Sequence, residues 1–395
     1  MPPALHIVIV VYGKTYSELL ASITLANVAA LLREVPAPLQ STTVLRILTT
    51  KDDVATIRAS SALVHIAGSV QLEIIDAVRL EGFDRFNRYG PMVLAQREAV
   101  IHAARVGAAL IFVGPDQIFN RGAFRTMVER MRQGYRVVVG PGLRIRRDDV
   151  RETLLGHIKR SADGTFALEP ADQARLLFGF WHQTNDQYLI GSDTSLWLKS
   201  IVTYRPHQQE LFVRCFQGPT LMLWPRQSVG DFEGFVDHAL INAVCSSWRE
   251  VYVVSDSVEC LALDMSEDSR YEDQPLADFP YVALLRQLFN RHATQDIQLE
   301  QGFRTCRIHD GEQPPRLVGK WRREFDRVVD PLILIALAER KIYRKFGGRI
   351  AILFRALSQV TAHTLILIVR PWCSHFAAKY RRIEPPDGDA SAPAR

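Results

Sequence analysis

Residues 108–116 read AALIFVGPD, an apolar run of six residues that ends in a turn and a carboxylate. An unbroken apolar run of this length is typical of a strand buried on both faces of a parallel sheet. His6–Val11 (HIVIVV) and Thr43–Thr49 (TVLRILT) are runs of the same kind. Helical periodicity fills the chain between them, over Thr15–Arg33 and Met92–Val106. The alternation predicts right-handed βαβ units on an open, mostly parallel sheet flanked by helices, an α/β fold.

Polar residues follow three of the predicted strands where each one ends. They are Tyr12 and Gly13 after His6–Val11, Asp52 and Asp53 after Thr43–Thr49, and Asp116 after the strand at 108–113, which is the fourth because Val70–Ile75 is predicted as the third. Ligands of open α/β sheets bind beyond the carboxyl ends of the strands. We therefore expect these residues to line one ligand site. Asp116 by itself fits an ordinary turn or helix cap, and its place beside the other acids leaves the structural and the functional interpretation equally open.

Composition and charge restrict the class of protein. The chain has 395 residues, of which 47% are hydrophobic and 23% charged, as in ordinary globular proteins. The net charge is +5, but residues 331–395 carry eleven Lys or Arg against four acids, so the first 330 residues are slightly acidic. A main domain that binds nucleic acid would need its own positive face, so we expect no nucleic-acid partner.

Several common motifs are missing. No GxGxxG follows the first strand, and there is no Walker motif, GxSxG or HExxH, which argues against dehydrogenases, P-loop NTPases, α/β-hydrolases and zincins. The five cysteines are widely spaced and are expected to be reduced, buried thiols. The N-terminus has no basic run before its first strand, so we expect no secretory signal and a cytoplasmic protein.

Residues 1–265 resemble glycosyltransferases of the GT-A type, the nucleotide-diphospho-sugar transferase fold, of the bacterial family 2 kind. The resemblance rests on the strand ends above and on Arg88-Tyr89-Gly90-Pro91-Met92, which precedes a helix and then Ile111–Phe119 (IFVGPDQIF). It implies a nucleotide-sugar donor. The residues that it assigns to the donor are Tyr12, Gly13, Asp52 or Asp53, Arg85 or Arg88, and Asp116, the last binding pyrophosphate through Mn²⁺ or Mg²⁺.

The metal-binding motif of that family has two acids separated by one residue, whereas Gly114-Pro115-Asp116-Gln117 keeps only one. A single carboxylate holds a divalent cation weakly without a second ligand from the protein. The resemblance gives that role to His238 and the role of catalytic base to Asp237. Asp231 and Glu233 compete for the base. Asp237 also fits the cap of the helix that follows, with His238 packed in its first turn.

The acceptor is expected to be a saccharide or a lipid-linked sugar. Phe178–Asp186 gathers aromatic and polar residues, and Trp181 and His182 are its predicted acceptor contacts, because sugar rings stack on aromatic faces. A buried aromatic core is the competing interpretation of this block.

The C-terminal part divides by composition into three segments. Residues 266–330 are a polar connection, 331–383 a basic helical extension, and 384–395 (EPPDGDASAPAR) have the composition of a disordered tail. Polar residues interrupt Ile350–Val369, so this apolar stretch is not a membrane span. Two interpretations of the extension stay open: helices on an anionic membrane surface, or a helical hairpin packed on the body.

The resulting hypothesis is a cytoplasmic glycosyltransferase, peripheral to the inner face of the membrane, in polysaccharide biosynthesis. Two alternatives remain. One is an inactive glycosyltransferase-like scaffold recruited to the membrane, which the single acid at Asp116 favours. The other is a nucleotidyltransferase, whose glycine-rich and basic loop is absent where Tyr12-Gly13-Lys14-Thr15 stands.

Overall fold

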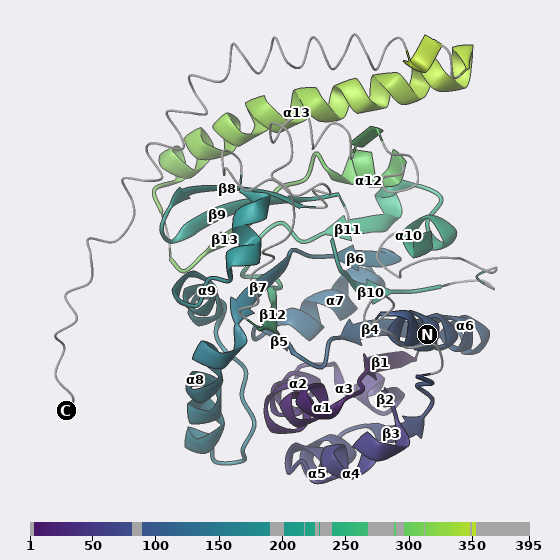
Figure 1. The fold of residues 1–395 in the computed structure, drawn as a ribbon, viewed down its shortest axis with the longest axis vertical. Helices are drawn as coiled ribbons and strands as arrows, with labels where there is room; N and C mark the ends of the chain where they lie inside the picture. Colours follow the sequence, from purple (N-terminus) through teal and green to yellow (C-terminus); the bar gives the residue numbers. More distant parts are fainter. Residues whose placement is uncertain are drawn as a thin grey trace, which may run out of the picture.

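The computed structural model describes residues 4–80, 89–189, 201–216, 218–225, 229, 239–267, 288–289, 296–311, 313–347 and 350–352. These residues form a mixed α/β molecule with a central sheet and two smaller sheets beside it (Figure 1).

The central sheet has seven strands in the order β11-β6-β10-β4-β1-β2-β3. The strands are β1 (Leu5–Val10), β2 (Thr43–Thr49), β3 (Gln71–Asp76), β4 (Ala109–Val113), β6 (Val137–Val139), β10 (Thr220–Leu223) and β11 (Val251–Val253). β10 pairs antiparallel with β4 and β6, and the other described pairings in this sheet are parallel. The prediction of a mostly parallel α/β sheet is confirmed.

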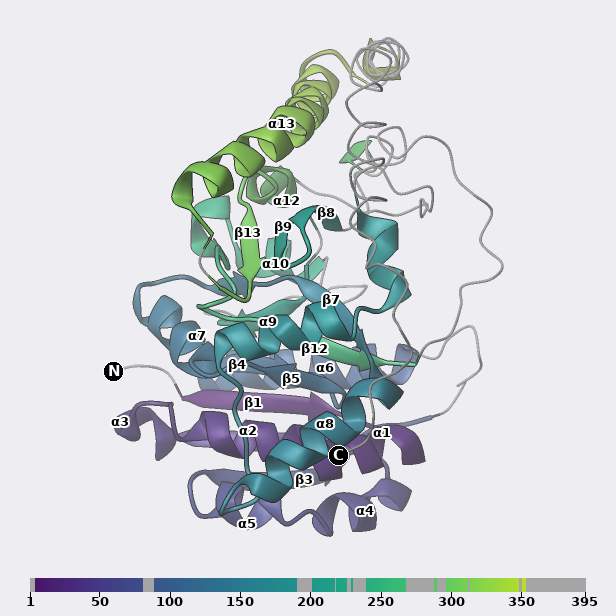
Figure 2. The same ribbon diagram turned by 90° about the vertical axis from the view of Figure 1, so that its left-hand side faces the viewer.

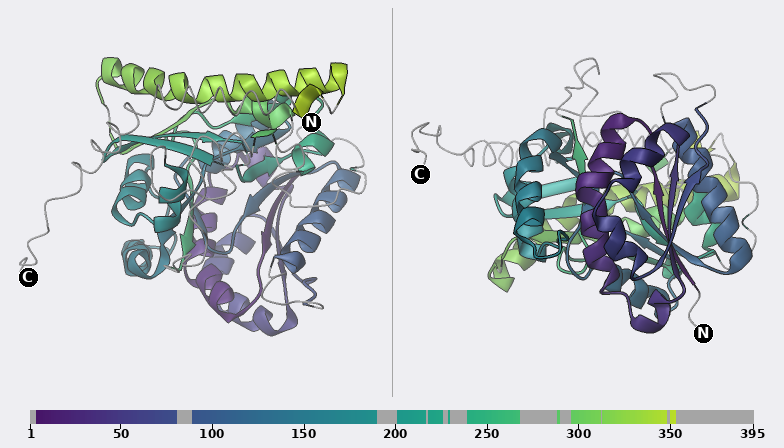
Figure 3. Two further views of the ribbon diagram at one scale, coloured as in Figure 1. Left: turned by 45° about the horizontal axis from the view of Figure 1, so that its top comes forward. Right: turned by 90° about the horizontal axis from the view of Figure 1, so that it is seen from below.

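Helices cover both faces of this sheet (Figure 3). Leu5, Ile7 and Ile9 of β1 share one core cluster with the helices on one face, and Val8 and Val10 share another with the helices on the opposite face. The first group of helices is α1 (Lys14–Leu19), the π-helical turn η1 (Leu20–Thr24), α2 (Leu25–Leu32), α3 (Ala37–Gln40), α4 (Val54–Arg58), α5 (Ala62–Ala67) and α7 (Ala123–Arg132). The second group is α6 (Gly90–Val106) and α10 (Ala239–Val244).

One of these helical stretches, Lys14–Leu32, is long and apolar enough to cross a membrane by length and composition alone. Two-thirds of its apolar window is buried inside the molecule, where it packs on β1. Core helices of soluble proteins pass the same test, and this helix is part of the core.

The second sheet joins segments that are distant in sequence. It has the order β5-β12-β7, with β5 (Gln117–Phe119), β12 (Ala262–Ser266) and β7 (Gly142–Arg146). β12 is antiparallel to β5 and parallel to β7. Beside it lie α8 (Arg147–Arg160), α9 (Pro170–Gly179) and the short helix η3 (Gln183–Tyr188). Because β5 begins just after β4 ends, this sheet carries residue 264 to the carboxyl edge of the central sheet.

The third sheet is antiparallel, in the order β13-β9-β8, with β13 (Cys306–His309), β9 (Glu210–Cys215) and β8 (Ile201–His207). α12 (Asp296–Gln301) and the long helix α13 (Pro315–Phe346) pack on it. Figures 1 and 2 show α13 along the side of the molecule that is farthest from β1–β3. α13 runs through Pro331 without a break, so the polar connection and the basic extension share one helix.

Candidate active site

Three neighbouring strands bring their polar ends to one edge of the central sheet. β1 pairs in parallel with β2 and β4, with Ile9 opposite Ile47 and Val113. The side chain of Asp53 reaches across to the end of β1, where its Oδ2 accepts the N–H of Gly13 at 2.9 Å. The structure therefore brings together two of the residues that the sequence assigns to a nucleotide.

Gly13 and Asp53 shape the turn after β1. Gly13 has a φ of 85°, a left-handed conformation that suits glycine, and its carbonyl accepts the N–H of Ser17 at the start of α1. Asp53 also accepts the Thr50 hydroxyl at 2.6 Å and is only 8% exposed. Asp52 is exposed and is the acid of this pair that a ligand can reach.

Asp116 lies in a tightly held turn between β4 and β5. The Pro115 carbonyl accepts the Thr24 hydroxyl at 2.8 Å, and the Asp116 carbonyl accepts the N–H of Met265 at 2.8 Å. Gly114 lies against the carboxylate: a Cβ on Gly114 would stand 3.1 Å from Oδ1 of Asp116. These contacts fix the half-buried Asp116 carboxyl at the sheet edge.

Asp264 is the second acid of the site, and sequence reasoning missed it. In β12 it is opposite Gln117 on one side and Arg144 on the other, and its Oδ1 accepts the Gln117 side-chain amide at 2.9 Å. Burial, and after it the negative charge of Asp264, raises the pKa of Asp116 to about 7. Arg144 and Arg147 act in the opposite direction. Two carboxyls with a raised pKa between them are typical of a site built for a cation or a proton.

Tyrosines and an ion pair surround these acids. Burial raises the pKa of Tyr16, helped by the charges of Asp116 and Glu267 and by Tyr89, so these groups share one electrostatic environment. Arg147, the first residue of α8, binds the Glu267 carboxylate at 3.0 Å. Tyr16 is 43% exposed, so this environment is open to solvent on one side.

The predicted acceptor residues have different environments. Trp181 is half-buried; its indole N–H donates to Asp186 at 2.8 Å, and the Arg205 guanidinium lies 4.8 Å from its ring centre. His182 is 1% exposed, with one ring nitrogen accepting the N–H of Thr184 at 3.1 Å and the other 2.7 Å from the Glu267 carbonyl. His182 is therefore buried and held between η3 and the segment that carries Glu267.

The predicted base Asp237, its competitors Asp231 and Glu233, and the predicted ligand His238 lie outside the described residues, as do Arg85 and Arg88. Within the described part of the chain, no group of three or more His, Cys, Asp or Glu side chains is placed to hold a metal ion. Asp116 and Asp264 supply two carboxyls. Since Mg²⁺ is commonly held by one or two carboxylates together with substrate phosphates, this pair fits a divalent cation whose remaining ligands come from a pyrophosphate.

No protein-family model matches the chain, and no curated protein matches it. Among solved structures, the chain is similar to mannosyltransferase PcManGT from Pyrobaculum calidifontis, solved in complex with GDP-Man and Mn²⁺. The two sequences are 12% identical, and the match covers 97% of this chain and 87% of that one, with a TM-score of 0.33. A TM-score this low establishes neither a shared fold nor a shared activity.

Proposed function

We propose that this chain is a glycosyltransferase of the GT-A type that moves a sugar from a nucleotide-diphosphate donor to a saccharide or lipid-linked acceptor. One observation carries the proposal: Asp116 lies at the carboxyl edge of a mostly parallel sheet, held by the strand that carries Asp264 and near enough to that acid for its charge to raise the Asp116 pKa. This edge is where open α/β sheets bind their ligands. The turn after β1 and the exposed Asp52 would contact the nucleoside.

Asp116 and Asp264 would hold a divalent cation against the donor pyrophosphate. When bound, such an ion neutralises the charge that builds up on a departing nucleoside diphosphate. Arg147 and Tyr16 are near enough to Asp116 to interact with the same charge. In an inverting reaction the acceptor oxygen attacks the anomeric carbon, the bond to phosphate breaks, and Asp237 takes the acceptor proton. A retaining reaction needs no such base.

The first test is the thermal stability of the protein with UDP, GDP, CDP and dTDP, each with Mn²⁺, Mg²⁺ or EDTA. A nucleotide at about 100 times its dissociation constant stabilises the fold by about 2.7 kcal/mol. We expect one nucleotide to stabilise the protein, and more strongly with metal. Stabilisation that survives EDTA would remove the metal from the proposal, and no stabilisation by any nucleotide would favour the scaffold.

The variant Asp264→Asn tests the second acid of the site, which has no counterpart in the motif that the resemblance predicts. It should abolish the metal-dependent part of the nucleotide effect. Asp256→Asn is the control, since Asp256 lies after β11 and pairs with His309 at 3.2 Å. If the protein bound a nucleotide but transferred no sugar, and if Asp116→Ala left that binding unchanged, the inactive scaffold would be the better assignment.

We further propose that the end of α13 contacts an anionic membrane surface. Tyr343 and Phe346 are 43% and 53% exposed, and Ile350 and Ile352, just beyond the helix, are 48% and 66% exposed. Exposed cations lie among them at Lys341, Arg344 and Lys345. Apolar side chains between basic ones suit the headgroup region, where each Lys or Arg contributes about 1 kcal/mol.

Co-sedimentation with phosphatidylglycerol vesicles tests this location. Lys341→Glu/Arg344→Glu/Lys345→Glu should abolish binding that the wild-type protein shows and that salt weakens. The control Arg316→Glu/Lys320→Glu/Arg323→Glu makes the same charge change at exposed positions in the first turns of α13. Equal binding by both variants would refute the membrane contact and leave α13 as a packed helix.

A further inference from the structure

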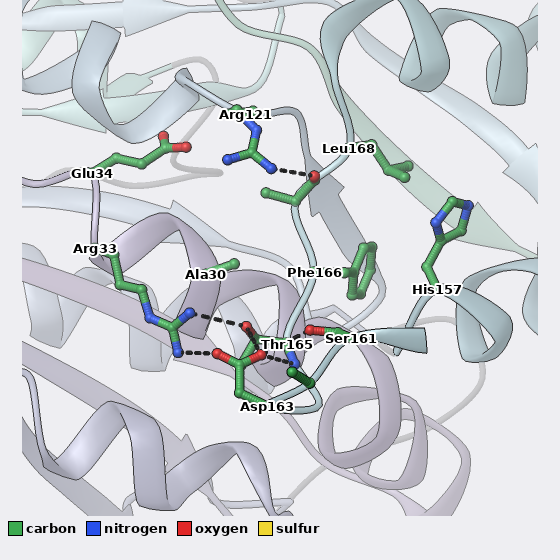
Figure 4. A pocket seen from close by; sticks show the side chains of 12 residues that line it. Ala30, Arg33, Glu34, Arg121, His157, Ser161, Asp163, Thr165, Phe166 and Leu168 are labelled. Carbon is green, nitrogen blue, oxygen red and sulfur yellow. Dashed lines mark hydrogen bonds and ion pairs between the residues drawn. The ribbon is translucent and has the colours of Figure 1, made fainter. Parts of the chain in front are cut away.

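A pocket of about 530 Å³ opens beside the second half of α2 (Figure 4). The chain that leaves Asp116 runs along α2 toward it. Pro115 is bonded to Thr24, and further on the N–H of Gly122 donates to Oε2 of Glu34 at 2.7 Å. Since a helix rises by about 15 Å from Thr24 to Glu34, the pocket is separate from the candidate active site.

The floor of the pocket is apolar. Ala30 of α2 lies in it with Phe166 and Leu168, which are 7% and 4% exposed and belong to the segment between α8 and α9. That segment is fixed: the N–H of Phe166 donates to the Ala26 carbonyl at 3.3 Å, and the carbonyl of Leu168 accepts the N–H of Arg121 at 2.7 Å. The floor is therefore formed before any ligand arrives.

The charges at the rim cancel in pairs. Arg33 binds Asp163 at 2.6 Å, and Arg121 binds Glu169 at 2.6 Å. Asp163 also accepts the hydroxyls of Ser161 and Thr165, both at 2.8 Å, so its pKa is held below its usual range. With both guanidiniums engaged by carboxylates, the rim suits neither a phosphate nor a free cation.

Two half-buried polar groups face the pocket from opposite sides, Glu34 from the end of α2 and His157 from α8 (Figure 4). Glu34 uses Oε2 for Gly122. Within the described part of the chain, no hydrogen bond engages its other oxygen or the imidazole of His157. Burial and the charge of Arg160 lower the pKa of His157, so this ring is neutral at pH 7 and can both donate and accept.

We propose that this pocket binds a neutral saccharide. A sugar ring has an apolar face of C–H groups, which the Phe166 and Leu168 floor accommodates, and hydroxyls around its edge, which Glu34 and His157 can bond. The volume lies within the range of about 300 to 1,000 Å³ that is usual for small-molecule sites. The proposal does not depend on the proposed function, because none of these residues belongs to the sheet edge around Asp116.

The test is saturation-transfer NMR followed by calorimetry, with D-glucose, D-mannose, D-galactose, N-acetylglucosamine and their disaccharides as probes. Wild-type protein should bind at least one of them in the millimolar range. Ala30→Leu fills the pocket with a good helix former and should abolish binding. Glu34→Gln should weaken it about tenfold, the usual effect of losing a charged hydrogen bond. Ala55→Leu, at an exposed site on α4, and Glu98→Gln, at an exposed site on α6, are the controls.

The experiment is repeated with saturating UDP or GDP in EDTA. Sugar binding that persists there, and that Ala30→Leu removes without lowering the melting temperature, supports the pocket. Binding that Asp116→Ala removes, and Ala30→Leu does not, would place the sugar in the active site and overturn the proposal. Absence of binding by every probe would also overturn it, as would pocket-dependent binding of guanosine or uridine in place of sugars.

Discussion

At Gly114 a single methyl group can test whether the Asp116 carboxyl is the centre of the site. A Cβ there would lie 3.1 Å from Oδ1 of Asp116 and 3.3 Å from Cβ of Gln117, closer than ordinary contacts. Gly114→Ala should therefore displace the carboxyl by a few tenths of an ångström while the fold remains intact. We expect a loss of nucleotide stabilisation or turnover of about tenfold, since binding geometry is sensitive to such shifts.

Gly179→Ala is the control, because a Cβ on Gly179 meets nothing within 4 Å. Melting temperatures of both variants should stay close to that of the wild-type protein. If Gly114→Ala retained full turnover, Asp116 would not be the centre of the site.

The Asp116 carboxyl should also lower the free energy of unfolding, and the size of this effect should depend on pH. Its folded pKa of about 7 lies above its ordinary value of 3.8. Between these values the unfolded chain loses a proton that the folded protein keeps, so stability falls as pH rises through this window. In EDTA, Asp116→Asn should be more stable than the wild-type protein by about 2 to 4 kcal/mol at pH 8 and by much less at pH 4.5. Urea unfolding at both pH values measures this, and an equal gain at both would show that the pKa of Asp116 is not raised in the folded protein.

The sequence predicts that Asp116, Asp53 and Gly13 lie at one edge of the sheet, because each follows a buried strand and parallel strands align their ends. Asp264 could not be found in this way. It lies within a strand, and its approach to Asp116 depends on β12 pairing with β5, a segment 147 residues earlier. The environment of His182 could not be predicted for a similar reason, because the Glu267 carbonyl that engages this ring comes from a distant segment.

Among the elements, α13 is attached to the third sheet by a buried charge. Arg214 of β9 is 1% exposed and donates to Asp326 and Asp330 of α13, the latter at 2.5 Å, and to Thr305 at 3.1 Å. Arg214→Ala would leave the partly exposed carboxylates of Asp326 and Asp330 without their cation. We expect the free energy of unfolding to fall by about 2 to 3 kcal/mol, as for lost hydrogen bonds to charged groups, and α13 to become sensitive to protease.

Arg79→Ala breaks an exposed ion pair with Asp76 instead and should cost less than about 1 kcal/mol. Urea unfolding and limited proteolysis compare the two variants. Equal losses would mean that Arg214 does not hold α13.

The elements of residues 5–139 follow their sequence pattern closely, because each buried run or helical period is local. The position of β10 does not. Thr220–Leu223 is a short apolar segment, and its antiparallel insertion between β4 and β6 is a property of the assembled sheet. The same holds for α13, whose first half is polar in composition and helical because Phe325 and Val329 pack on the third sheet.

The stability of the whole molecule should fall in mild acid because of His6. This ring is 5% exposed in β1 and stacks on His102 of α6 at 5.6 Å; burial, then the charges of Arg46 and His102, lower its pKa to about 4. The unfolded chain takes up a proton near pH 6.5 that the folded protein refuses until about pH 4. Stability is therefore lost as pH falls through that window, by up to about 3 kcal/mol.

His6→Leu should flatten the dependence of melting temperature on pH between 7 and 4.5. His65→Leu, which removes an imidazole from α5, should leave the slope as it is. Parallel slopes for all three proteins would exclude His6 as the source.

The late arrival of β10 has a consequence for synthesis on the ribosome. β1 to β4 can pair as soon as they emerge, but β6 has no direct neighbour among them, because β10 separates it from β4 and follows it by about 80 residues. Until β10 emerges, one edge of β4 stays unpaired in the nascent chain, and the apolar segment of β6 has no strand to pair with. Such edges invite association with other chains. Production of this protein should therefore benefit from slower translation or from chaperones that bind emerging chains.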